Sequence, residues 1–190
     1  MKLTLTKKAF TLVEILIIAA VIVTIAAIAI PIVISYRINA NEGAAISNLR
    51  MLHGAIESYS AANKGAYPTS LCIHESELYN SNPRYLNDTT FGTCSWDHFP
   101  EMGGGTKQNY WYWYLRPTNP LWDSTITTSD YVLYAGPSEA VGAGTDPNVW
   151  RWRGRRTFRI LSNGQIQWIW REGAVYPDSW TVPSNIHPLE

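Results

Sequence analysis

The chain has 190 residues, which is room for one membrane helix and one modest globular domain. It carries fifteen basic and fifteen acidic side chains, and the absence of a basic excess argues against bulk nucleic-acid binding as its main function. Aromatic residues are the compositional outlier, with nine Trp and eleven Tyr. They lie almost entirely beyond Tyr59, so they belong to the globular part and not to the membrane segment.

An apolar run dominates the start of the chain. From Ile15 to Ile34 there is no charged residue, and Thr24 is the one polar interruption. As a helix this run reaches about 30 Å, enough to cross the hydrocarbon core of a bilayer. The flanking basic residues are Lys2, Lys7 and Lys8 before the run and Arg37 after it. By the positive-inside rule, the short leader stays cytoplasmic and the globular part lies outside.

A carboxylate at Glu14 stands at the edge of this span, where an ionisable side chain is costly and indicates a function. Its natural partner is a cation at similar depth. If the chain were cut between Ala9 and Phe10, the new α-amino group of Phe10 would be that cation. Residues four apart share a helix face, so the pair could form within one chain. In an array of parallel helices it could instead join neighbours and set their stagger.

The stretch Lys7-Lys8-Ala9-Phe10-Thr11-Leu12-Val13-Glu14-Ile15 resembles the class III signal of type IV pilins and type II secretion pseudopilins. That family has a short basic leader, cleavage before a Phe and a Glu as the fifth mature residue. These features map onto the Ala9/Phe10 bond and Glu14. Pro31 falls where the family often has a helix-kinking proline. The family's peptidase usually cuts after Gly, where this chain has Ala9.

The resemblance implies a structural subunit and not an enzyme, with no cofactor. A membrane aspartyl prepilin peptidase would remove residues 1–9, and Phe10 would be N-methylated. The loss of three lysines would leave twelve basic against fifteen acidic residues. The subunit would wait as a single-pass inner-membrane protein. An assembly platform and its ATPase machinery would then build it, with copies of itself, into a periplasmic or cell-surface filament. Phe10, Glu14 and Pro31 would act in assembly. Pilus or pseudopilus, and major or minor subunit, stay open.

Two simpler explanations of the apolar run fit less well. A secretory signal peptide has an apolar core of about 7–15 residues followed by an Ala-x-Ala-like site, and this run is longer and lacks such a site. A plain signal anchor explains the length and the lysines, but it explains neither Glu14 nor the Phe-Thr-Leu-Val-Glu order.

Helical periodicity continues past the membrane run. An apolar stripe recurs at spacings of four and three. Its members are Ala45, Leu49, Leu52, Ile56 and Tyr59. Polar residues, which we expect on the other faces, are Asn41, Glu42, Asn48, Arg50 and Glu57. The pattern predicts one helix from about Phe10 to Asn63, with a transmembrane half at 10–36 and an amphipathic half at 37–65.

Proline and glycine punctuate this helix. Pro31 lacks a backbone donor and should kink or locally melt it. Gly43 and Gly54 weaken it or let another group approach closely. Asn63-Lys64-Gly65 reads as the helix end, with the glycine as a left-handed cap.

Residues 66–190 read as a globular domain with a long loop region, Ser70–Gly105, followed by an antiparallel sheet. The predicted strands are Asn109–Leu115, Asp130–Ala135, Arg156–Leu161 and Gln165–Arg171, the last two flanking the hairpin signal Asn163-Gly164. Gly136–Asn148 reads as a flexible loop and Val175–Glu190 as an irregular tail. The fold class is therefore α+β, a long helix on a small antiparallel sheet, which again resembles pilins.

The loop region holds Cys72 and Cys94, and with His74 and His98 they could in principle form a Cys2His2 zinc site. A Cys-x-His pair is awkward for one tetrahedral metal. In an exported domain two thiols favour a disulfide over a metal site. The disulfide would stabilise the fold by roughly 3 kcal/mol in the chain-entropy model.

An arginine- and tryptophan-rich stretch is the one candidate ligand patch. Its members are Trp150, Arg151, Trp152, Arg153 and Arg155, continued by Arg156, Phe158 and Arg159. Arginines among aromatics can bind phosphate backbones or stack on bases, and a Trp and Tyr surface can grip a polysaccharide. On that interpretation the chain is a binding module for glycan or DNA on a membrane stalk. Strand alternation offers the simpler account, in which tryptophans pack inward and arginines face water or acidic neighbours.

Catalytic signatures are absent from the sequence. Gly103-Gly104-Gly105-Thr106-Lys107 lacks the spacing of a phosphate-binding loop, and neither His-Glu-x-x-His nor Gly-x-Ser-x-Gly occurs. We therefore expect that this protein is not an enzyme.

Overall fold

The computed structural model describes residues 10–72, 76–92, 105–117, 129–137, 154–170 and 187–189. The chain divides into two compact units, Met1–Tyr36 and Arg37–Glu190. The helical elements are α1 (Leu12–Ala62), α2 (Glu77–Asn80) and the 3-10 turn η1 (Thr89–Gly92). The strands are β1 (Thr106–Lys107), β2 (Tyr110–Leu115), β3 (Val132–Pro137), β4 (Arg156–Leu161), β5 (Ile166–Trp170) and β6 (His187–Pro188). The predicted α+β composition is confirmed.

The first unit contains the apolar part of α1. Among the described residues, α1 is the one helix long and apolar enough to cross a membrane. Its helical hydrogen-bonding pattern continues through Pro31, so the predicted local melting there is wrong. Proline removes one backbone donor from this 51-residue helix, and the carbonyl of Pro31 accepts from the Ser35 hydroxyl at 3.1 Å.

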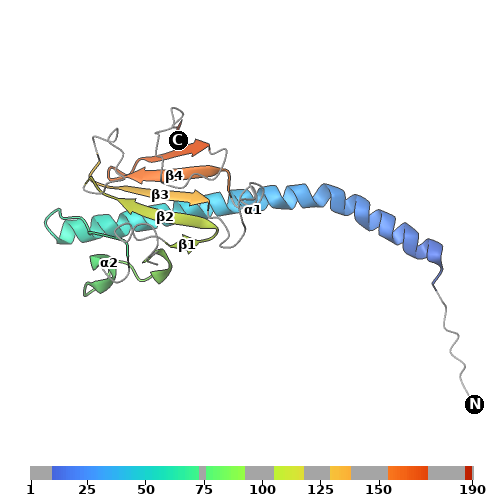
Figure 1. Cartoon of the computed structure of the whole chain (residues 1–190), viewed down its shortest axis with the longest axis horizontal. Coiled ribbons are helices and arrows are strands. Elements are labelled where there is room, and N and C mark those ends of the chain that lie inside the picture. Colours follow the sequence, from blue (N-terminus) through green and yellow to red (C-terminus); the bar gives the residue numbers. More distant parts are fainter. Residues whose placement is uncertain are drawn as a thin grey trace, which may run out of the picture. The chain divides into compact units, whose positions relative to one another are not determined.

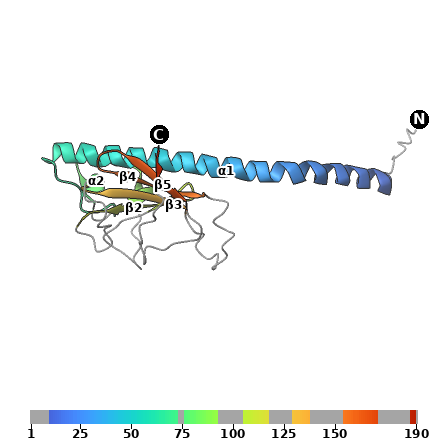
Figure 2. The ribbon, with the colours of Figure 1, turned by 90° about the horizontal axis from the view of Figure 1, so that it is seen from above.

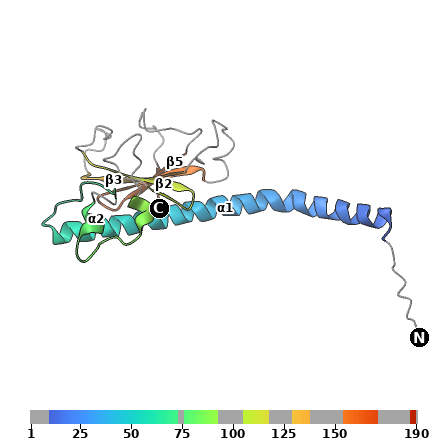
Figure 3. The same cartoon turned by 60° about the horizontal axis from the view of Figure 1, so that its bottom comes forward.

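In the second unit, the remaining part of α1 lies along one face of an antiparallel sheet (Figures 1 and 2). The predicted stripe makes this contact: Ala45, Leu49, Leu52 and Ile56 are fully buried, and Tyr59 is half-buried against the core. Exclusion of these side chains from water drives the packing of α1 on the sheet. The short helix α2 lies beside the C-terminal end of α1 (Figures 1 and 3).

The sheet is a six-stranded meander in the order β1-β2-β3-β4-β5-β6, with every neighbouring pair antiparallel. Side chains on β2 alternate, as the period of two along a strand requires. Tyr110, Tyr112 and Tyr114 are buried in the core shared with α1, and the intervening Trp111 and Trp113 are half-buried. The tyrosines of this strand therefore form the centre of the core.

The hairpin at Asn163-Gly164 is confirmed, with a three-residue loop. The N–H of Gly164 donates to the carbonyl of Leu161 at 2.9 Å, and Gly164 has φ +79°. Asn163 is not in the left-handed region, so this is not the two-residue turn that Asn-Gly is typical of. The pattern matches a turn closed by a glycine bulge, which needs a residue without Cβ at that position.

The end of α1 differs slightly from the prediction. Gly65 has φ +86°, but the residue before it, Lys64, also has a left-handed φ of 58°. The N–H of Gly65 donates to the carbonyl of Ser60 at 2.9 Å, which places Lys64 at the left-handed position of a Schellman motif. The suggested close approach at Gly43 and Gly54 is wrong, because a Cβ at either position would meet no atom within 4 Å.

Several element bounds also differ. β3 begins at Val132 and runs to Pro137, later than the predicted 130–135. The pair β5–β6 puts His187 opposite Trp168, so the segment expected to be an irregular tail contributes a strand. Likewise α2 and η1 lie in the stretch read as a long loop. These elements are two to four residues long, too short to carry a periodic signal.

Candidate functional site

The N-terminal end of α1 holds two of the predicted assembly residues, Phe10 and Glu14, whereas Pro31 lies further along the helix. Glu14 Oε2 accepts hydrogen bonds from the N–H and the hydroxyl of Thr11, both at 2.9 Å, and Thr11 Oγ1 accepts from the N–H of Glu14 at 3.3 Å. This reciprocal pair is a capping box, which satisfies N–H groups that have no partner within the helix. The leader with Ala9 lies outside the described residues.

The capping box adds a role that the sequence analysis missed. Within one uncut chain, the Glu14 carboxylate bonds Thr11, the residue after Phe10. The signal was present as Thr-x-x-Glu directly before an apolar run. Because Thr11 is a neutral donor, Glu14 keeps a net negative charge that can still attract an α-amino group.

Apolar side chains project from every face of this segment. Phe10 is 75 % exposed and Leu12 80 %, and the other large apolar residues up to Tyr36 are 48–70 % exposed, apart from the half-buried Ile34. An open apolar surface at the N-terminal end is lined by Phe10, Thr11, Leu12, Ile15, Leu16 and Ala19. A face of this size calls for lipid or other apolar helices as its surroundings.

Glu42 corrects the prediction for the second half of α1. The sequence placed it on a polar face, but it is only 3 % exposed. Its Oε1 accepts from the backbone N–H groups of Arg155 (2.8 Å) and Arg156 (3.2 Å). Its Oε2 accepts from Nε (2.8 Å) and Nη2 (2.6 Å) of the Arg156 guanidinium. The carboxylate is buried because the start of β4 supplies a full set of donors.

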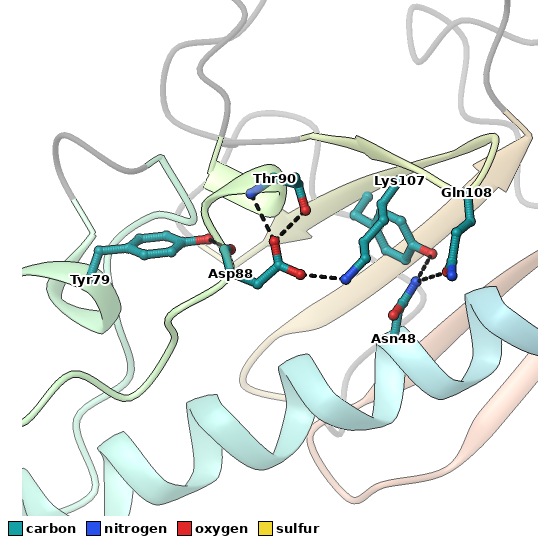
Figure 4. Close-up of polar contacts among 7 residues, drawn as sticks. Asn48, Tyr79, Asp88, Thr90, Lys107 and Gln108 are labelled. Carbon is teal, nitrogen blue, oxygen red and sulfur yellow. Dashed lines mark hydrogen bonds and ion pairs between the residues drawn. The ribbon is translucent and has the colours of Figure 1, made fainter.

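Asn48 is corrected in the same way, since it is 9 % exposed and faces the sheet. Its amide donates to Gln108 Oε1 and to the Tyr112 hydroxyl, both at 2.9 Å (Figure 4). Nearby, Lys107 pairs with Asp88, whose other oxygen accepts from the N–H and hydroxyl of Thr90 (Figure 4). These bonds hold the turn before β2 against α1 and against η1.

A third polar contact joins α1 to the residue before β3. The Tyr131 hydroxyl donates to Glu57 Oε1 at 2.8 Å and lies 2.6 Å from His53 Nδ1. The phenol of Tyr131 has a single hydrogen, which it donates to Glu57. In the contact between Tyr131 and His53, the hydrogen therefore belongs to Nδ1 of His53. Burial, and then the neighbouring Glu57, raise the pKa of Tyr131.

The candidate ligand patch is only partly described. Trp150, Arg151, Trp152 and Arg153 lie outside the described residues. Arg155 is exposed and uses its backbone N–H on Glu42. Arg156 pairs with Glu42 and lies over the rings of Phe158 and Trp168, and Arg159 donates to Gln167 at 2.7 Å. For Arg156, the simpler prediction of an acidic neighbour is confirmed.

The cysteine and zinc predictions are not tested by the described residues. Cys72 is buried, and His74, Cys94 and His98 lie outside the described ranges. The part of the chain that is described contains no group of three metal-ligating side chains. The Cys72–Cys94 disulfide therefore stays a prediction.

No family model, curated protein or solved structure matches this chain.

Proposed function

We propose that the chain is a structural subunit of a type IV pilus or a type II secretion pseudopilus. Cleavage of the Ala9/Phe10 bond by a prepilin peptidase would yield a subunit that polymerises through residues 10–34. The assembly platform and its ATPase would draw this segment out of the inner membrane into the filament. The observation that carries the proposal is a single acidic residue, Glu14, at the start of a helical segment that is apolar and otherwise uncharged as far as Tyr36.

Two further features support this function. The large apolar side chains of residues 10–33 are exposed, which suits a helix that moves from lipid into a bundle of like helices. The carboxylate of Glu14 accepts from the N–H of Thr11, the residue that follows Phe10, where the new α-amino group would be. A charge pair in apolar surroundings selects one stagger between neighbours even where it adds little stability.

Intact mass measurement on membranes and on sheared surface material tests the proposal. We expect a species that begins at N-methylated Phe10. Its presence in the sheared fraction favours a pilus, and its restriction to the envelope favours a pseudopilus. A species that retains residues 1–9, in cells that process other prepilins, contradicts the proposal and favours the membrane-anchored binding module.

Glu14 variants separate the charge from the helix cap. Glu14→Gln keeps an oxygen acceptor for Thr11, because Gln also serves in a capping box, but it removes the charge. Glu14→Val removes both. We expect both variants to be processed and neither to form filaments. Filaments from Glu14→Gln alone would show that the cap matters and that the charge does not; filaments from both would exclude the charge-pair mechanism.

A further inference from the structure

The buried Glu42 joins two parts of the second unit, the helix α1 and the start of β4. It lies on α1, with Ile38, at the first buried turn of the helix in this unit. Its four donors come from two consecutive residues, Arg155 and Arg156, at the start of β4. We name this set of contacts, Glu42 with Arg155 and Arg156, the Glu42 clasp.

The strand side of the clasp is itself fixed by the core. The Tyr110 hydroxyl donates to the carbonyl of Arg156 at 3.0 Å. A Cβ at Gly154 would lie 2.0 Å from that hydroxyl oxygen, so the close approach of the Tyr110 side chain requires glycine there. The backbone that bonds Glu42 is therefore also held by the Tyr110 side chain of β2.

Directional contacts of this kind resist sliding in a way that apolar contacts do not. Dispersion and hydrophobic burial have no direction, so a stripe such as Leu49, Leu52 and Ile56 can be repacked after a shift along the helix axis. A shift of one turn, about 5.4 Å, would break all four bonds of the clasp and leave a buried carboxylate unpaired. Glu42 therefore specifies one register of α1 on the sheet.

We propose that the Glu42 clasp is the coupling point between α1 and the sheet. Through it, force on the membrane segment enters the second unit, Arg37–Glu190, which we also call the globular unit. This inference depends on the proposed function, in which machinery draws the helix out of the membrane. The clasp is placed for such a role because it lies at the first buried turn after Tyr36, where the first unit ends. Load on α1 reaches the clasp before it reaches the apolar stripe.

Neighbouring arginines offer a matched pair of variants. Arg155→Gln and Arg156→Gln make the same change in charge and size at adjacent positions. The Arg155 side chain is exposed and contributes only its backbone N–H, whereas the Arg156 guanidinium donates both bonds to Oε2. Glu42→Gln removes the charge of the partner side chain. It also removes one acceptor, because the amide nitrogen of Gln cannot accept from the guanidinium.

Amide hydrogen exchange on the full chain in detergent micelles tests the clasp directly. In Arg156→Gln and Glu42→Gln, we expect exchange in residues 38–45 to become at least about tenfold faster, equal to about 1.4 kcal/mol in the free energy of local opening. Residues 49–56 should keep their protection, and Arg155→Gln should match the wild type throughout. Equal protection of residues 38–45 in Arg155→Gln and Arg156→Gln would overturn the proposal.

A second measurement covers a variant that fails to fold. If Arg156→Gln unfolds globally, the double variant Glu42→Gln/Arg156→Gln removes both charges and should recover the fold, because the buried Glu42 carboxylate is no longer left unpaired. Recovery with fast exchange in residues 38–45 supports the clasp, and recovery with wild-type exchange there overturns it.

Filament yield then tests the mechanical role. Where the wild type forms sheared filaments, we expect Arg156→Gln to lower the yield several-fold at equal amounts of processed subunit, and Arg155→Gln to leave it unchanged. Equal yields from both variants would overturn the force-coupling role. Absence of filaments from the wild type would count against the proposed function, whereas the exchange result would still decide whether the clasp exists.

Discussion

Three polar side chains on the sheet-facing side of α1 each bond a different part of the second unit. Glu42 binds the start of β4, Asn48 binds the turn before β2 and Tyr112, and Glu57 binds Tyr131 before β3. A buried polar group is costly unless it is hydrogen-bonded, so each contact penalises any other register of the helix. Specificity of the helix position therefore comes from single residues, and stability comes from the apolar stripe between them.

The lowered pKa of Asp88 predicts that the second unit loses stability in acid. Its hydrogen bond from Lys107, and then those from Thr90, lower the pKa of the Asp88 carboxyl. A depressed pKa means that the stabilisation is present above the unfolded-state value, near pH 4, and is lost as the pH falls through the lower folded value. We expect Asp88→Asn to flatten the acid limb of a thermal-stability profile. An unchanged acid limb in this variant would contradict the assignment.

The raised pKa of Tyr112 predicts that the second unit loses stability in alkali. Burial raises the pKa of Tyr112 to about 12, against a smaller opposing effect of its bond from Asn48. A raised pKa means that the stabilisation is fully present below pH 10 or so and is lost as the pH rises through the folded value. We expect tyrosinate absorbance to develop in two phases, the later one together with loss of near-UV circular dichroism. A single phase at the ordinary tyrosine pKa, with the fold retained, would show that these phenols are not buried.

At the scale of elements, the packing of α1 on the sheet predicts a contrast between two adjacent helix positions. Leu52 is fully buried in the core and Met51 is 41 % exposed. Leu52→Ala should lower the free energy of unfolding of the globular unit by about 2–5 kcal/mol, since it leaves a cavity. Met51→Ala should change it by less than about 0.5 kcal/mol. Denaturant unfolding in micelles, followed by tryptophan fluorescence, compares them; equal losses would mean that the stripe is misassigned.

Elements with a long or repeated pattern were predictable from sequence, and those fixed by distant partners were not. The stripe of α1, the alternation in β2 and the Asn163-Gly164 hairpin each carry a local signal. The strand β6 and the burial of Glu42 depend on partners far along the chain, and their own residues carry no trace of it. In the candidate site, Glu14 stood out as a charge in an apolar run, whereas its bond to Thr11 was predictable from Thr-x-x-Glu and was missed.

At the scale of the molecule, the chain joins two units that differ in where their apolar side chains lie. The unit Met1–Tyr36 exposes apolar side chains on all faces of its helix, and the unit Arg37–Glu190 buries a core of tyrosine, leucine and isoleucine. Under the proposed function each unit has its own environment, because lipid or neighbouring helices cover the first and the second lies outside the cytoplasm. The environment of the second unit is open to a chemical test through its cysteines.

The two cysteines report the compartment of the globular unit. If this unit is exported, Cys72 and Cys94 meet an oxidising environment and pair. Protein denatured without reduction should then take up no alkylating reagent, and reduced protein should take up two equivalents by intact mass. Cys72→Ser supplies the control, because the remaining thiol has no partner in the chain and should take up one equivalent without reduction. Two equivalents in unreduced wild type would place the unit in a reducing compartment and reverse the predicted topology.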